Sequence, residues 1–241
     1  MNFIKKLFHK AQPHTFISIT HNEFKQLLYK EITPKMLKYG FQYDGQYTWY
    51  SEIQNNMRKS VSVCLLKGAS AIFRWSVTFD FIPFPSGNRL TYSKTEKKIL
   101  PHLFEYPNDY YKSFESEADS LIWRRSSCKM TQMGNGIQEI IESINTAFLY
   151  DLKKYENWHN EFITINDAIR MASAKINSDG KPLYPFFYPS PLYILSFLLA
   201  ATDKKEEGKD LLRHYLSSEN HWSEEIKEKI TQKFDKIDKL H

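Results

Sequence analysis

The chain has 241 residues, of which 41% are hydrophobic, 15% aromatic and 25% charged. This length and composition fit one large globular domain, or a domain with an appendage, and exclude a disordered or fibrous chain. The cysteines Cys64 and Cys128 are too few for a disulfide framework, and no apolar run reaches about 18 residues. We therefore expect a reduced, cytoplasmic protein without a transmembrane helix.

Charge is distributed unevenly along the chain. Residues 1–100 carry 15 Lys and Arg against 6 Asp and Glu, a net charge of +9, whereas the remainder carries 18 against 22, a net charge of −4. A basic first half favours an acidic partner, whether protein, nucleic acid or lipid. The basic, amphipathic segment 1–10 buries too little apolar area to anchor the chain, so we expect no membrane attachment.

The first predicted element is a helix that begins after Thr20. Thr20 and Glu23 have the spacing of a capping box, and apolar residues recur at helical spacing from Phe24 onwards. Gly40 is a suitable left-handed stop, and Pro34 is predicted to kink or divide the helix. Tyr39 and Phe41 are then expected to be packing residues.

From residue 46 the hydrophobic period changes to two. Alternation in 46–53, 58–67 and 72–84 predicts three strands joined by short hairpins, which is typical of an antiparallel meander. The third strand is expected to direct one set of side chains into the core: Phe73, Trp75, Val77, Phe79 and Phe81. The opposite set should face solvent: Arg74, Ser76 and Thr78. In the first strand, Tyr50 is expected to be exposed, as is Tyr43 before it.

The rest of the chain is predicted to be mostly helical. Residues 120–130 are consistent with a fourth strand, and helical spacing then extends from Ile137 to about Trp158. Thr164 caps another helix, and a helical hairpin and a final helix from Ser223 follow the proline-rich connector.

Together these elements predict an α+β fold, in which an N-terminal helix packs on an antiparallel β-meander of three to five strands and a helical C-terminal half follows. The predicted domains are residues 1–135 and 136–241, with a further boundary within 177–190.

The order "F..LL...I.P.MLKYGFQYDGQYTWY" resembles a bacterial family known as domain of unknown function 4304. The resemblance covers about residues 16–84, or at most residues 16–130. It uses packing residues, which are Leu37, Gly40, Phe41, Gly45 and Trp49, the last standing where the pattern has Phe or Tyr. It implies no catalytic residues. By analogy with small bacterial families in toxin–immunity loci, it suggests an immunity protein.

Residues with the spacing of a catalytic or metal site are not evident. The eight histidines are scattered, and neither a G-x-S-x-G nucleophile motif nor a metal-ligand motif occurs. The glycines of "MGNGIQEI" lack the lysine of a phosphate-binding loop. We therefore expect no metal, no cofactor and no enzymatic activity.

The segment "WRRSSCK" combines an aromatic residue with two arginines, as single-strand-binding surfaces do, but it also fits a sheet strand with its polar face outward. The candidate partner-binding residues are Tyr50, Arg74, Trp123, Arg124 and Arg125. The predicted function is a non-enzymatic protein-binding module with an acidic protein partner, a toxin in the case of an immunity protein. The alternative is a nucleic-acid-binding accessory protein that uses the basic N-terminal half.

Overall fold

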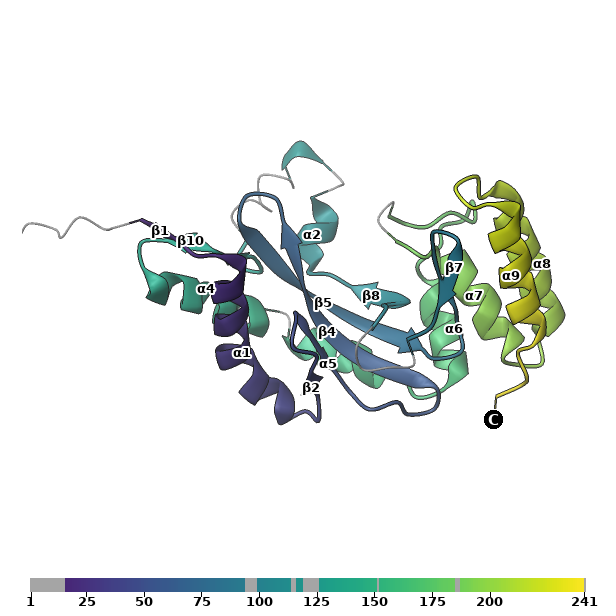
Figure 1. The fold of residues 1–241 in the computed structure, drawn as a ribbon, viewed down its shortest axis with the longest axis horizontal. Helices are drawn as coiled ribbons and strands as arrows, with labels where there is room; N and C mark the ends of the chain where they lie inside the picture. The colour runs from purple at the N-terminus through teal and green to yellow at the C-terminus, as the bar shows by residue number, and fades with distance from the viewer. Residues whose placement is uncertain are drawn as a thin grey trace, which may run out of the picture. The chain divides into compact units, whose positions relative to one another are not determined.

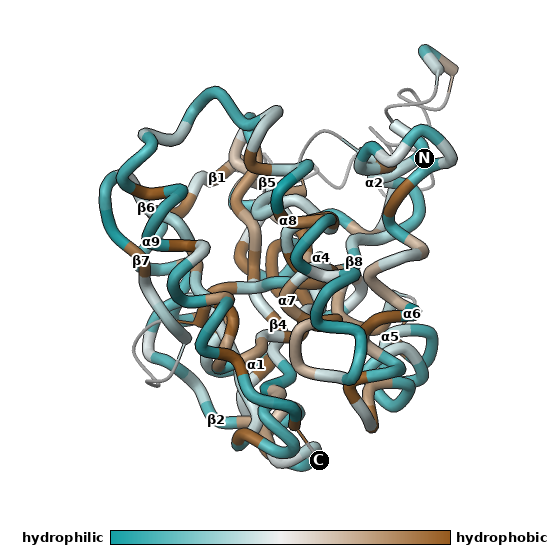
Figure 2. Tube along the Cα trace, turned by 90° about the vertical axis from the view of Figure 1, so that its right-hand side faces the viewer, coloured by the Kyte–Doolittle hydropathy of each residue, from teal (hydrophilic) through white to brown (hydrophobic). Residues whose placement is uncertain are grey.

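The computed structural model describes residues 16–93, 99–113, 116–118, 126–150, 152–184 and 187–240. The predicted α+β fold is confirmed: an N-terminal helix precedes an antiparallel sheet, and the C-terminal half is mostly helical (Figure 1). Hydrophobic residues occur in short stretches along the trace (Figure 2). Among the described residues, no helix has the length and apolar character needed to cross a membrane.

The main sheet has the strand order β2-β3-β4-β5-β8, with β9 also paired to β5. Its strands are β2 (Gln42–Tyr43), β3 (Thr48–Tyr50), β4 (Met57–Leu66), β5 (Ser70–Phe79), β8 (Leu103–Glu105) and β9 (Met130–Thr131). The three predicted strands are β3, β4 and β5, so the antiparallel meander is confirmed. Two small sheets pair β1 (Ile17–Ser18) with β10 (Met133–Gly134) and β6 (Phe84–Ser86) with β7 (Arg89–Thr91).

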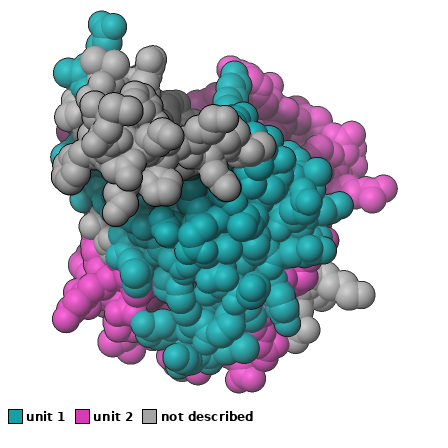
Figure 3. Space-filling view, turned by 90° about the vertical axis from the view of Figure 1, so that its left-hand side faces the viewer, with its two compact units in different colours: residues 1–39, 63–73, 106–151 teal, residues 40–62, 74–105, 152–241 magenta. Residues whose placement is uncertain are grey.

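The chain folds into two compact units that interleave along the sequence (Figure 3). Unit 1 consists of residues 1–39, 63–73 and 106–151; unit 2 consists of residues 40–62, 74–105 and 152–241. The strands β4 and β5 each contribute residues to both units. The predicted division at residues 135 and 136 concerns independent folding and stays a prediction.

Unit 1 contains α1 (His21–Leu37), α2 (Asn108–Lys112) and α4 (Ile137–Leu149). The predicted capping box is confirmed, because the Glu23 carboxylate accepts from the Thr20 N–H at 2.7 Å and the Thr20 hydroxyl accepts from the Glu23 N–H at 3.3 Å. Pro34 does not divide α1, which runs as one helix to Leu37. The buried side chains of α1 and α4 form the core of their contact: Phe24, Leu28, Ile32, Met36, Ile140, Ile144 and Phe148.

Unit 2 contains α5 (Leu152–Asn160), α6 (Ile165–Ser173), α7 (Pro191–Ala200), α8 (Lys205–Ser218) and α9 (Glu224–Asp235). The apolar helix α7 is almost wholly buried because it packs against both α6 and α8. The capping box of Thr164 with Asp167 and the Ser223 cap are confirmed.

The prediction of one helix from Ile137 to about Trp158 is wrong. Helix α4 ends at Leu149, and Tyr150 adopts an extended backbone with ψ of 120°. The Tyr150 hydroxyl donates to the Asp109 carboxylate at 3.1 Å, which holds this residue outside the helical path. Helix α5 begins in the other unit.

The prediction of which side chains are buried and which face solvent needs correction at several residues. Four residues of β5 face the core as predicted: Phe73, Trp75, Val77 and Phe79. However, Ser76 and Thr78 are also buried, because their hydroxyl groups bond within the protein: that of Ser76 lies 2.7 Å from the Ser60 hydroxyl, and that of Thr78 donates to the Leu100 carbonyl at 2.7 Å. Phe81 follows the strand and is only half-buried. Tyr39 is 52% exposed rather than packed, because α1 has already ended there, whereas Phe41 is buried as predicted.

Candidate functional site

The sheet residues of unit 2 present two chemically different faces. Trp49 pairs with Val61 on β4, and Tyr50 with Ser60, so alternation separates these pairs to opposite faces. The Ser60 and Ser76 hydroxyl oxygens lie 2.7 Å apart, which places Ser76 on the same face as Ser60. We call this face the polar face and define it by Tyr50, Arg58, Ser60, Ser62, Arg74, Ser76 and Phe104.

The opposite face of the sheet is packed against α5. The Trp75 ring stacks on Tyr155 with centroids 5.2 Å apart and an interplanar angle of 13°. His159 lies 5.2 Å from the Trp75 ring and 6.0 Å from the Phe41 ring, and its Nε2 is 3.1 Å from the Ser76 carbonyl oxygen. Burial, followed by the charge of Lys59, lowers the pKa of His159 to about 3. This histidine is therefore neutral and forms part of the core.

At one side of the polar face, Arg58 lies over Tyr50. The guanidinium carbon is 5.2 Å from the Tyr50 ring centroid, and the two residues are 7% and 6% exposed. The expectation that Tyr50 is an exposed anchor is therefore wrong. Its register partner Ser60 directs the ring onto the polar face, where Arg58 covers it.

Arg74, the second predicted site residue, is held in a fixed orientation. Its Nε donates to the Ser62 hydroxyl at 3.1 Å, and its guanidinium carbon lies 5.5 Å from the Phe104 ring centroid. Phe104 is itself buried against Phe187, with ring centroids 5.1 Å apart. Arg74 as a whole is partly exposed, and these two contacts orient its guanidinium.

The acid nearest to Phe104 in sequence is already paired. Glu105 forms an ion pair with Lys175, and both side chains are 14% exposed. Lys175 also lies 5.7 Å from the Phe187 ring centroid. Within the described parts of the chain, Arg74 forms no ion pair with a carboxylate. Its positive charge is therefore available to a ligand.

The other three predicted site residues, Trp123, Arg124 and Arg125, lie outside the described residues, as does the N-terminal segment 1–10. Their relation to Arg74 stays a prediction. Sequence reasoning missed Arg58, Ser62 and Phe104 as members of this face. The alternation Arg58, Ser60, Ser62 along β4 could have indicated the first two, but the short strand β8 has no period of its own.

The described part of the chain contains no group of three or more His, Cys, Asp or Glu side chains that could hold a metal ion. Comparison with known proteins finds no matching family model, no similar curated protein and no similar solved structure. The resemblance to domain of unknown function 4304 therefore stays a prediction.

Proposed function

We propose that this chain is a non-enzymatic protein-binding module, and that Arg74, the partly exposed residue of the polar face, contacts an acidic surface of its partner protein. The observation that supports the proposal is the oriented guanidinium of Arg74, which forms no ion pair with the described residues. Arginine is enriched among the residues that dominate the energetics of protein interfaces.

The same face favours a protein over a single-stranded nucleic acid. Single-strand binding depends on exposed aromatic rings on which bases can stack. On the polar face, however, Tyr50 is covered by Arg58, and Phe104 lies beneath Arg74 and against Phe187. The nucleic-acid alternative rests on the basic charge of residues 1–100 and on the segment "WRRSSCK", whose Trp123, Arg124 and Arg125 lie outside the described residues.

An immunity protein is the specific form of this proposal. Such a protein binds a toxin encoded beside it, and an acidic surface on the toxin would complement the basic first half of this chain. Complementary charge would also speed the encounter of the two proteins. The support for this form is the analogy with small bacterial families in toxin–immunity loci.

The test is to co-express the chain with the proteins of adjacent genes and to measure the dissociation constant of any complex by calorimetry. Arg74→Glu should weaken binding by about 30-fold or more, because it places a like charge against an acidic surface. Arg89→Glu is the matched control, since Arg89 is exposed on β7, outside the polar face. Equal affinity of the wild type and Arg74→Glu would exclude the polar face.

Two other outcomes would overturn the proposal itself. Nucleic acid that co-purifies with the chain and is released by salt, with no protein partner, would support the alternative function. Catalytic turnover by the isolated chain would show that it is an enzyme.

A further inference from the structure

We propose, on the basis of the function proposed above, that Arg74 forms a carboxylate-binding site that takes one acidic side chain of the partner end-on, through both Nη atoms. The proposal specifies the ligand chemistry, the atoms that bind it and the direction of approach.

The direction of approach follows from the hydrogen bond that Arg74 already makes. A guanidinium can bind a carboxylate side-on, through Nε and one Nη, or end-on, through its two Nη atoms. The Nε of Arg74 donates to the Ser62 hydroxyl at 3.1 Å. The side-on mode therefore requires the loss of this bond, and the end-on mode does not.

The guanidinium also has a second contact besides Ser62. The Phe104 ring lies 5.5 Å from the guanidinium carbon, and Phe187 supports that ring from within unit 2. Ser62 stands on β4 and Phe104 on β8, so Arg74 on β5 is held from both neighbouring strands. A side chain held in this way loses little conformational entropy when it binds.

The charge of the polar face fits a singly charged ligand. Its second guanidinium, that of Arg58, is 7% exposed and lies over Tyr50. Of the two arginines among the residues that define the polar face, Arg74 is therefore the one that is partly exposed. One guanidinium balances one carboxylate, whereas a phosphate dianion usually requires more positive charge.

The experiment uses the full chain labelled with ¹⁵N and a synthetic acetyl-triglutamate amide as the probe. Acetyl-triglutamine amide is the uncharged control, and inorganic phosphate tests the competing anion. We expect the glutamate peptide to shift the Arg74 Nη resonances while the Nε–H signal keeps the shift set by Ser62. The glutamine peptide should cause no shift, and phosphate should bind at least about 10-fold more weakly than the glutamate peptide.

Variants separate a positioned guanidinium from a simple positive charge. Arg74→Lys keeps the charge but loses the two-atom contact, and should weaken peptide binding by about 10-fold. Ser62→Ala should weaken it by about threefold and shift the Arg74 Nε–H signal, because the anchor is removed. Arg89→Lys on β7 is the control and should leave peptide binding unchanged.

Three results would overturn the carboxylate site: equal binding by the wild type and Arg74→Lys, equal binding of the glutamine peptide, or tighter binding of phosphate. Loss of partner binding in Arg74→Glu without any peptide binding would leave the proposed function in place and remove only this inference. If Arg74→Lys failed to fold, the wild-type Nη and Nε–H signals would still decide between the two modes.

Discussion

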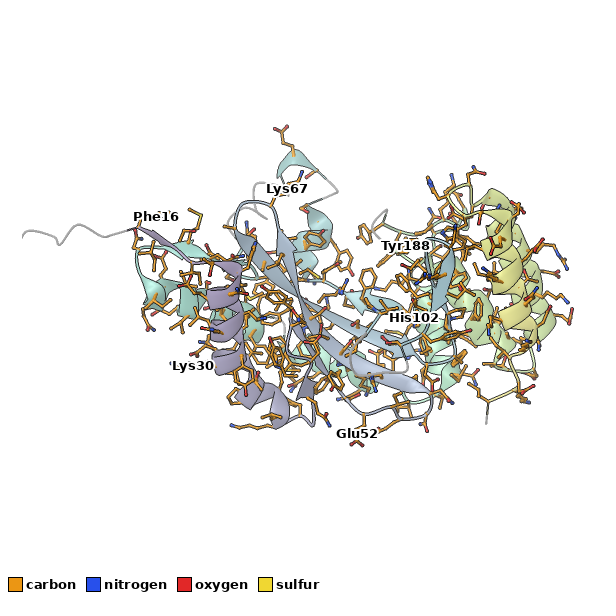
Figure 4. The ribbon with its side chains drawn as sticks, in the orientation of Figure 1. Phe16, Lys30, Glu52, Lys67, His102 and Tyr188 are labelled. Atoms are coloured by element: carbon orange, nitrogen blue, oxygen red, sulfur yellow. The ribbon has the colours of Figure 1, made fainter. Side chains whose placement is uncertain are left out.

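The Nδ1 atom of His102 accepts a hydrogen bond from the backbone N–H of Phe79 at 2.9 Å, in the position where a neighbouring strand would supply a carbonyl. The imidazole ring also stacks on the Phe79 ring, with centroids 5.8 Å apart and an interplanar angle of 19°. His102 is labelled in Figure 4, where the described side chains are drawn on the ribbon. Because Nδ1 is the acceptor, the proton of the neutral ring resides on Nε2. A buried side chain thus accepts the hydrogen bond of the backbone N–H at the last residue of β5.

The stability of the fold should decrease as the pH falls below neutrality. Burial lowers the pKa of His102 to about 3, and the pKa of His159 is lowered to a similar value, from an ordinary value of about 6.5. Between about pH 6.5 and 3 the unfolded chain binds protons at both residues and the folded chain does not. The free energy of unfolding therefore decreases as the pH is lowered through this range. Each histidine should contribute up to about 1.4 kcal/mol per pH unit.

Urea denaturation at pH 7, 6 and 5 would measure this dependence. His102→Asn keeps a hydrogen-bond acceptor near the Phe79 N–H but does not titrate. Its free energy of unfolding should therefore change less steeply with pH than that of the wild type, by up to about 1.4 kcal/mol per pH unit, which corresponds to one proton. A wild-type stability that is flat from pH 7 to 5 would contradict the neutral, buried state of both histidines.

Replacing Trp75 should remove the centre of the packed side of the sheet. Its ring is 4% exposed and is held between Tyr155 and His159 of α5. Trp75→Ala should lower the free energy of unfolding by about 3–5 kcal/mol, because it removes a large buried side chain and leaves a cavity. A loss below about 1 kcal/mol in chemical denaturation would show that α5 does not depend on this contact.

The sequence predicted those parts of the fold that depend on local patterns. The capping boxes at Thr20 and Thr164 and the inward set of β5 depend on spacing within one segment. Both capping boxes are confirmed, as are four of the five inward side chains, the exception being Phe81 after the end of the strand. The burial of Tyr50 and Ser76 could not be predicted in the same way. It depends on side chains from other strands, on Arg58 over Tyr50 and on Ser60 beside Ser76, and no period within a single segment encodes these pairs. Arg74 was predicted, whereas its supports Ser62 and Phe104 were not.

Asn145 of α4 should be a measurable link between the two main helices of unit 1. Its Oδ1 accepts from Lys35 Nζ, and its Nδ2 donates to the Glu31 carboxylate at 3.2 Å and to the Ile141 carbonyl at 3.1 Å. Asn145→Ala should lower the free energy of unfolding by about 1–3 kcal/mol, because Lys35 and Glu31 lose the amide that joins them. Thr146→Ala, at the adjacent exposed position, should change it by less than about 0.5 kcal/mol. Equal effects of the two variants in denaturant titrations would contradict a role for the network.

Gly208 allows α8 to approach α7 more closely than any other residue would. A Cβ atom at this position would lie 2.6 Å from the Ser196 carbonyl oxygen and 3.0 Å from the Leu199 Cβ atom. Both neighbours belong to the buried helix α7, and the carbonyl is backbone that cannot rotate away. In an exposed helix, alanine would be more stable than glycine by about 1 kcal/mol.

Here Gly208→Ala should instead lower the free energy of unfolding by about 1–3 kcal/mol, because the added methyl group overpacks the contact between the helices. Thermal and urea denaturation would measure the loss. Glu207→Ala is the matched control, since Glu207 precedes the glycine on α8 and is exposed. It should change stability by less than about 0.5 kcal/mol. A higher unfolding midpoint for Gly208→Ala than for the wild type would mean that helix propensity outweighs the contact, and that α7 and α8 are not packed this closely.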